Sequence, residues 1–129
     1  DEEDVDAAVT LLRANWNGLA DFYQPPHFVA EVAAVLAMKK PDEAQADLGD
    51  LLEIEFRLIG DATIHQTALD LAIRLDHHLF DTLYHAVALH TPGALLVTAD
   101  RRYFTKAEPI GHILLLNNPL LTAREHQDA

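Results

Sequence analysis

Glu31 is an acidic side chain at a position where a carboxylate needs an explanation. It is the one charged residue in the apolar stretch between Phe28 and Met38. A helix that is apolar all round is expected to be buried. A buried carboxylate is costly unless it is paired, protonated or bound to a cation. Glu31 is therefore a candidate metal ligand; the alternative is that it reaches solvent at a helix edge or pairs with an arginine.

Two further acids, Asp81 and Asp100, belong to neighbouring elements of the chain. Asp81 lies in the first turn of a helix predicted over Phe80–His90 by its apolar spacing. Asp100 follows the apolar run Ala94–Ala99, which is typical of a strand buried on both faces. Ligands of open α/β sheets bind beyond the carboxyl ends of strands, so an acid there could coordinate a cation. Alternatively, Asp81 only complements the helix dipole and Asp100 only opens a turn.

Together the three acids indicate a particular class of cation. Clustered carboxylates repel one another, and at neutral pH they need a cation or a proton. Oxygen ligands suit Mg²⁺ or Mn²⁺ and not zinc. Such a metal can activate water and neutralise charge on a scissile phosphate. The chain has no cysteine and no serine, which excludes a thiolate metal site and a serine nucleophile.

The eight histidines raise the question of zinc, but their spacing does not support it. No His-Glu-x-x-His helix is present. His77 and His78 are adjacent, so they point in different directions on any regular element. His85 is one turn beyond Asp81 and could line the same cleft. We interpret most histidines as surface or half-buried residues.

Several residues around Asp100 could contact a phosphate-containing substrate. The hydroxyl of Thr98 could position a water or a carboxylate; the simpler alternative is a β-branched strand residue. Arg101, Arg102 and Lys106 could hold phosphates beside the acids, or form only a solvated turn.

Strands that alternate with helices predict an α/β fold of three layers, α/β/α, with a mainly parallel sheet. The expected helices are 5–15, His27–Lys40, a helix that starts at Pro41-Asp42 and carries Leu48, Leu51, Leu52 and Phe56 on its apolar side, His65 or Gln66 to Asp76, and Phe80–His90. The expected strands are Ala20–Gln24, Ala62–Ile64, Ala94–Ala99 and Ile113–Leu116, with an irregular piece between Asp100 and Gly111 and a less regular tail from Asn117.

The chain of 129 residues is expected to form a single domain, residues 1–129. Its net charge of -12, from 21 acids and 9 bases, argues against a broad basic surface for duplex binding. It leaves room for nucleic acid at a local basic patch or through metal ions, and it suits a basic protein partner. No apolar run has the length of a membrane span and no signal peptide is visible, so we expect a cytoplasmic protein with no membrane contact.

Three segments of the chain resemble the PIN-domain ribonucleases, in particular the VapC-like toxins of bacterial toxin–antitoxin pairs. The segments are Pro25–Ala33, Leu79–Ala86 and Leu96–Arg102. The family's second, third and fourth acids fall on Glu31, Asp81 and Asp100. The family also begins with a central strand that ends in an aspartate, and this chain starts beyond it. We therefore expect a single PIN-like domain that lacks the first strand, with reduced or no activity in this form.

The resemblance implies a Mg²⁺- or Mn²⁺-dependent endoribonuclease that acts as the toxin of a toxin–antitoxin pair. Glu31, Asp81 and Asp100 would hold the metal and carry catalysis. From their position beside Asp100, we expect Thr98, Arg101 and Arg102 to bind the RNA. The implied partners are an RNA substrate and a cognate antitoxin protein. The apolar residues Val5, Val9, Val35 and Leu36 could also supply a homodimer face; the alternative is that they belong to the ordinary core. The alternative is a catalytically silent PIN-like protein-binding module; a small Mg²⁺-dependent phosphatase ranks lower because no nucleophile segment is visible.

Overall fold

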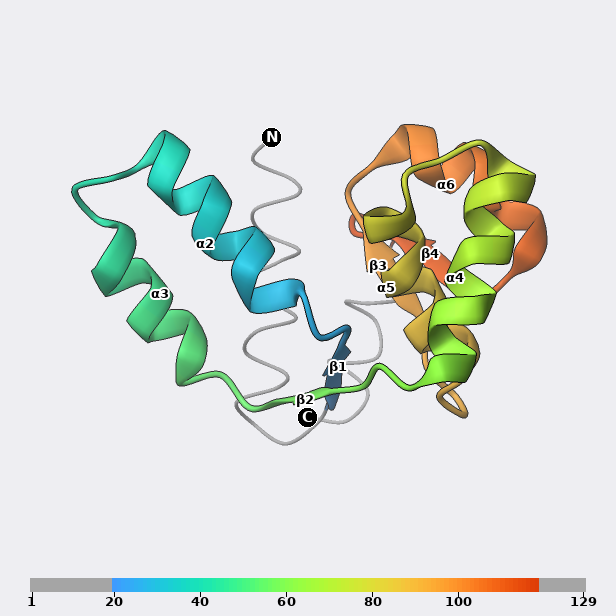
Figure 1. Ribbon diagram of the computed structural model, residues 1–129, viewed down its shortest axis with the longest axis horizontal. Coiled ribbons are helices and arrows are strands. Elements are labelled where there is room, and N and C mark those ends of the chain that lie inside the picture. Colours follow the sequence, from blue (N-terminus) through green and yellow to red (C-terminus); the bar gives the residue numbers. More distant parts are fainter. Residues whose placement is uncertain (1–19, 119–129) are drawn as a thin grey trace.

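The structure, a computed structural model, describes residues 20–118 and shows helices alternating with short parallel strands (Figure 1). The helices are α2 (Phe28–Lys39), α3 (Ala44–Leu52), α4 (Ala62–Leu75), α5 (Leu79–Leu89) and α6 (Arg101–Ala107), with a 3₁₀ turn, η1 (Glu108–Ile110). The strands are β1 (Phe22–Gln24), β2 (Phe56–Leu58), β3 (Leu96–Thr98) and β4 (Ile113–Leu115). The helix predicted over 5–15 and the end of the tail lie outside the described residues.

Both strand pairs are parallel, as the sequence pattern predicts. β1 pairs with β2, with Phe22 opposite Phe56, and the helices α2 and α3 form the crossover between them. β3 pairs with β4, with Leu96 opposite Ile113, and α6 and η1 form the second crossover. Within the described part of the chain the strands form these two pairs. The α/β class with parallel strands is therefore confirmed.

The core lies mainly between α4 and α5. Small residues let the two helices approach closely: Ala68 and Ala86 are fully buried, and Ile64 and Val87 pack beside them. The Thr82 hydroxyl donates a hydrogen bond of 2.8 Å to the Ala68 carbonyl oxygen across the same interface. This contact satisfies a buried polar group and joins α5 to α4. A second cluster, Tyr103, Ala107 and Ile113, packs α6 on β4.

The strand predicted at Ala62–Ile64 is wrong, because these residues form the first turn of α4. Asp61 caps the helix, and its Oδ1 accepts a hydrogen bond of 3.0 Å from the Ile64 backbone N–H. The cap satisfies a backbone group that a helix start would otherwise leave unpaired. Ile64, 1% exposed, then anchors the turn in the core.

The irregular piece predicted after Asp100 is also wrong, because it contains α6 and η1. Asp100 caps α6 just as Asp61 caps α4. Tyr103 and Ala107 lie four residues apart and are both buried, so one face of this short helix packs on the core. Packing against β4 stabilises α6, which has no helical pattern in its local sequence strong enough to predict it.

β2 was not predicted, and Phe56 lies in this strand and not on the preceding helix. α3 ends at Leu52. β2 is held by its pairing with β1, which continues as a hydrogen bond of 2.9 Å from the Ile59 N–H to the Gln24 carbonyl oxygen. A strand of three residues is too short to show an alternating pattern in the sequence. Its partner, β1, lies far away in the chain.

The predicted burial of two elements is wrong. No residue of α2 is buried, and the side chains of Val35 and Met38 are 49% and 77% exposed. α2 contacts mainly α3, and Figure 1 shows α3 and the carboxyl-terminal part of α2 lying away from α4, α5 and α6. β3 is half-buried and not buried on both faces, and Leu95 beside it is 44% exposed. β3 pairs with one strand only in the described residues.

Candidate metal centre

The start of α5 places Asp81 at the surface next to the end of β3. His78 caps the helix, and its Nδ1 accepts a hydrogen bond of 3.1 Å from the Phe80 N–H. Asp81 follows in the first turn, where a negative charge complements the helix dipole. Its side chain remains 51% exposed. Its place in the first turn and its exposure leave the Asp81 carboxylate accessible to a ligand.

Asp100 is held at the junction of β3 and α6 by two hydrogen bonds. Its Oδ1 accepts from the Tyr103 N–H at 3.0 Å, and its own N–H donates to the Thr98 hydroxyl oxygen at 3.0 Å. The predicted turn-opening role of Asp100 is thus real. It uses one carboxylate oxygen, so the other can serve a ligand.

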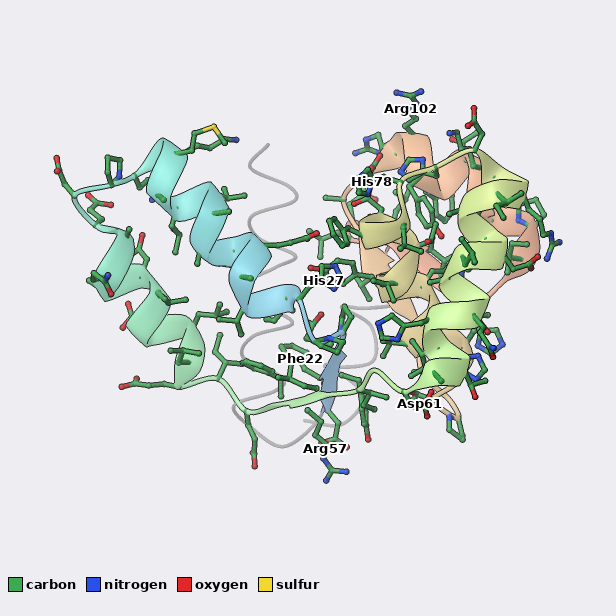
Figure 2. All side chains as sticks on the ribbon, viewed as in Figure 1. Phe22, His27, Arg57, Asp61, His78 and Arg102 are labelled. Atoms are coloured by element: carbon green, nitrogen blue, oxygen red, sulfur yellow. The ribbon has the colours of Figure 1, made fainter. Side chains whose placement is uncertain are left out.

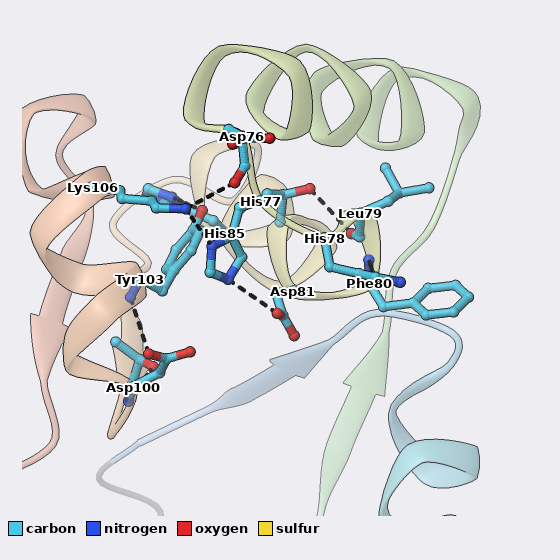
Figure 3. Close-up of polar contacts among 12 residues, drawn as sticks. Asp76, His77, His78, Leu79, Phe80, Asp81, His85, Asp100, Tyr103 and Lys106 are labelled. Atoms are coloured by element: carbon cyan, nitrogen blue, oxygen red, sulfur yellow. Dashed lines mark hydrogen bonds and ion pairs between the residues drawn. The ribbon is translucent and has the colours of Figure 1, made fainter.

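Asp81 and Asp100 converge with His77, a residue that precedes α5. One ligand atom from each residue lies within 4.8 Å of the others (Figure 3). The His77 Nε2 is 3.1 Å from the Asp81 Oδ2. Donors of one octahedral cation with bonds of about 2.1 Å lie about 3 to 4 Å apart, so small side-chain movements would close the group.

Sequence reasoning did not select His77 as a site residue. The side chain is half-buried, as expected for most histidines, with 11% of its surface exposed. Its ring packs edge-on against Tyr103, with the ring centroids 4.8 Å apart. The spacing of four residues between His77 and Asp81 was the available signal. The adjacency of His77 and His78, which point in different directions on any regular element, argues against a histidine site and obscures this signal.

Glu31 lies outside this group of three but on the adjoining side of α5. Its Oε2 accepts a hydrogen bond of 2.8 Å from the Tyr84 hydroxyl, and its Oε1 is 3.3 Å from the Nε2 of His27. Burial, followed by the hydrogen bond and charge of Glu31 and then the charge of Asp81, raises the pKa of Tyr84. Both carboxylates therefore act on one phenol. The side chain of Glu31 is 38% exposed and has these partners without a cation.

His85 does not line the cleft, contrary to the expectation from its spacing with Asp81. It is fully buried, where its Nδ1 accepts from the Tyr103 hydroxyl at 2.8 Å and its Nε2 donates to the Gly111 carbonyl oxygen at 2.8 Å. Burial lowers the pKa of His85. Burial and the charge of Asp81 raise the pKa of Tyr103, which keeps its hydroxyl as the donor. His85 therefore holds α5 to the chain before β4.

The basic residues near Asp100 take different directions. Arg101 and Arg102 are exposed in the first turn of α6, and Figure 2 shows Arg102 pointing away from the domain. Lys106 turns inward: its Nζ donates to the Asp76 carbonyl oxygen at 2.8 Å and lies 3.3 Å from the His77 Nδ1. The Thr98 hydroxyl oxygen accepts a hydrogen bond from the Asp100 backbone N–H.

The donor set fits a divalent cation. Across residues 20–118, no lysine or arginine forms an ion pair with Asp81 or Asp100. Two exposed carboxylates on neighbouring elements thus bring negative charge together, with His77 as the one basic side chain within ion-pair distance of them in the described part of the chain. Carboxylate oxygens are the ligands that Mg²⁺ and Mn²⁺ prefer, and an imidazole nitrogen nearby is compatible with Mn²⁺.

The sequence matches the family model described as PIN domain over residues 1–108. The match includes Glu31, Asp81 and Asp100. Comparisons with curated proteins and with solved structures gave no match.

Proposed function

Because this chain belongs to the PIN-domain family, whose members are typically metal-dependent nucleases, we propose that it is a Mg²⁺- or Mn²⁺-dependent endoribonuclease and the toxin of a toxin–antitoxin pair. The observation that carries the nuclease proposal is the convergence of Asp81 and Asp100 with His77. These residues lie at the starts of two helices, and a shared divalent cation would neutralise the two carboxylates.

The chain's own residues divide the work at this site. Asp81 and Asp100 would hold the cation, which would act as a Lewis acid and promote attack by water on a phosphodiester. Glu31 is a third acid near the same end of α5, and the Tyr84 hydroxyl orients its carboxylate. Through this contact Glu31 would bind or orient a water at the edge of the site.

The substrate side of the site is proposed from local charge. Arg101 and Arg102 are exposed directly after Asp100 and could contact phosphates that flank the cleaved bond. With a net charge of -12, the protein has no general attraction for a polyanion. Binding would then depend on these two arginines and on the cation, which favours a single-stranded or looped RNA that can be presented locally.

The test is an RNA-cleavage assay with the protein expressed from its complete reading frame. We expect cleavage with Mn²⁺ or Mg²⁺ that stops when EDTA is added. Asp100→Asn keeps the side-chain size and the helix cap but removes the charge. It should reduce cleavage about 100-fold, since removing one group that supports charge stabilisation in the transition state typically costs on this order.

The matched control is Asp61→Asn, because Asp61 caps α4 with the same 3.0 Å hydrogen bond far from Asp100 in the chain. The free energy of unfolding of both variants should lie within about 0.5 kcal/mol of that of the unmodified protein, since asparagine and aspartate cap helices equally well. Asp61→Asn should cleave RNA normally. Cleavage by Asp100→Asn at the rate of Asp61→Asn would contradict the proposed site.

We propose that the partner is a basic antitoxin segment that lies along α2. The support is the exposed apolar surface of α2, which includes Val35 and Met38, and the strong negative charge of the chain. An amphipathic helix could bury that surface, and a basic side chain beside Glu31 would meet the acids. Complementary charge would also speed association.

The homodimer expected from the apolar residues of the sequence, which include Val35, is a proposal for the same surface. Co-expression with the neighbouring gene, followed by size-exclusion chromatography, tests both. Capture of the small basic neighbour supports the antitoxin, and Met38→Glu should weaken the complex because it places a charge in the contact. A protein that is harmless alone, elutes as a monomer and captures no neighbour would contradict the toxin role.

The second candidate function is a catalytically silent protein-binding module. The exposed apolar side chains of α2 favour this function, because they offer a surface for a protein partner. Binding at that surface needs no metal. The two candidates differ in one measurement. A silent module would bind its partner with no EDTA-sensitive RNA cleavage under any divalent cation.

A further inference from the structure

Lys106, His77 and Asp81 form a continuous chain of polar contacts that ends at the candidate metal centre (Figure 3). The Lys106 Nζ donates to the Asp76 carbonyl oxygen at 2.8 Å and lies 3.3 Å from the His77 Nδ1. The His77 Nε2 lies 3.1 Å from the Asp81 Oδ2. The three side chains come from α6, from the residue before the α5 cap, and from α5.

The chemistry of the two end groups determines the tautomer of the ring between them. An ammonium has only donors, so the Nδ1 that faces Lys106 must accept and carries no proton. The ring proton is then on Nε2, which faces Asp81, and a carboxylate has only acceptors. Every contact in the chain is satisfied by one arrangement: Lys106 donates to His77, and His77 donates to Asp81.

We propose that His77 is a positioning residue for Asp81 and not a ligand of the cation. Its Nε2–H holds the Asp81 Oδ2, so that the other oxygen, Oδ1, is the one left for the cation. The catalytic part of this role rests on the proposed nuclease function, whereas the tautomer is a property of the protein alone.

The competing arrangement, with Nε2 bound to a metal, requires the opposite tautomer. The ring proton would move to Nδ1 and point at the Lys106 ammonium, and Lys106 would lose its acceptor there. Lys106 cannot move away from the ring without breaking its 2.8 Å hydrogen bond to the Asp76 carbonyl oxygen. Asp76 itself has left-handed backbone geometry, with φ of 49°, which turns this carbonyl at the end of α4.

The first test reads the tautomer directly in the metal-free protein. Long-range ¹H–¹⁵N NMR of protein labelled with ¹⁵N-histidine distinguishes the two tautomers, and the loss of one ring's signals in His77→Gln assigns His77. We expect the Nε2–H form. In Lys106→Met the ring loses the donor at Nδ1, and we expect its nitrogen signals to shift toward a mixture. The Nδ1–H form in the unmodified protein would overturn the proposal.

The second test measures Mn²⁺ by electron paramagnetic resonance. Removing the donor in His77→Leu should weaken Mn²⁺ binding about 10-fold, as is typical for a residue that orients a ligand. His77→Gln keeps an N–H at a similar place and should bind almost as the unmodified protein does. The NMR test with Lys106→Met also needs a control for the loss of a positive charge. That control is Lys40→Met, which removes an exposed lysine paired with Glu43.

Pulsed measurements on the same samples separate a ligand from a positioning residue. A nitrogen bound to Mn²⁺ gives a strong ¹⁴N coupling, and we expect no such coupling from His77. A strong coupling that disappears in His77→Gln would overturn the proposal. If Mn²⁺ does not bind at all, the nuclease proposal fails while the NMR result for the tautomer still stands.

Discussion

At the scale of single residues, the site is built from side chains that serve structure and chemistry together. Asp100 caps α6 with one oxygen and offers the other to a ligand. Asp81 sits at the positive end of α5 and accepts from His77. Tyr103 packs on His77 and donates to His85. Because each residue has a structural partner, its position does not depend on the cation.

His85 should make the stability of the protein depend on pH. Its folded-state pKa is lowered, chiefly by burial, while in the unfolded chain it is about 6.5. Its contribution is therefore complete above about pH 6.5. As the pH falls below that value, His85 is protonated more readily in the unfolded chain than in the folded protein, so the free energy of unfolding decreases.

Chemical denaturation of the unmodified protein and of His85→Gln at pH 7.5 and pH 5 checks this. At pH 7.5 the variant should be less stable by about 1–3 kcal/mol, since it disturbs two buried hydrogen bonds. At pH 5 the gap should narrow, because only the unmodified protein carries the titrating ring. His65→Gln, at an exposed histidine, should match the unmodified protein at pH 7.5. An equal gap at both values would contradict the prediction.

At the scale of elements, two helical crossovers and one tight loop set the geometry. The loop between β2 and α4 contains Gly60, where an added Cβ would overlap the ring of Pro26. This close approach brings the start of α4 next to the segment between β1 and α2. Gly49, in the exposed interior of α3, has nothing within 4 Å of the same added atom.

Replacing each glycine by alanine should therefore have opposite effects on stability. Gly60→Ala should destabilise the protein by about 1–3 kcal/mol, because a ring and a backbone must move apart. Gly49→Ala should stabilise it by about 0.5–1 kcal/mol through the higher helix propensity of alanine. Thermal unfolding of the two variants side by side measures both. Destabilisation by Gly49→Ala would show that α3 packs differently.

At the scale of the whole molecule, negative charge is the main feature. The net charge is -12, and among residues 20–118 no lysine or arginine forms an ion pair with Asp81 or Asp100. Such a charge repels itself in the compact state, so a bound cation relieves it. No helix in the described part of the chain is both long and apolar enough to cross a membrane.

Mn²⁺ should therefore raise the melting temperature of the protein. A ligand present at 100 times its dissociation constant stabilises the folded state by about 2.7 kcal/mol. The double variant Asp81→Asn/Asp100→Asn should lose this increase. Sodium chloride at the same ionic strength is the control, since it screens the net charge without filling a site. An equal rise in the double variant would place the cation elsewhere.

Local patterns in the sequence were sufficient for the elements that carry their own signals. The apolar spacing of the Phe80–His90 segment predicted α5, observed at Leu79–Leu89, and the apolar run before Asp100 predicted β3. The alternation of helices and strands predicted parallel pairing, and three short segments indicated the PIN family, which the match over residues 1–108 confirms. These features depend on neighbours a few residues apart.

Tertiary structure alone decided the features that depend on distant partners. β2 exists because β1 pairs with it, and α6 is a helix because Tyr103 and Ala107 pack on the core. The exposure of α2 depends on which elements reach it, which its apolar composition does not reveal. Likewise, His77 joins Asp81 and Asp100 only because the start of α5 folds against the end of β3. A side chain's residue type states which atoms it offers, but only the fold determines which other atoms those atoms meet.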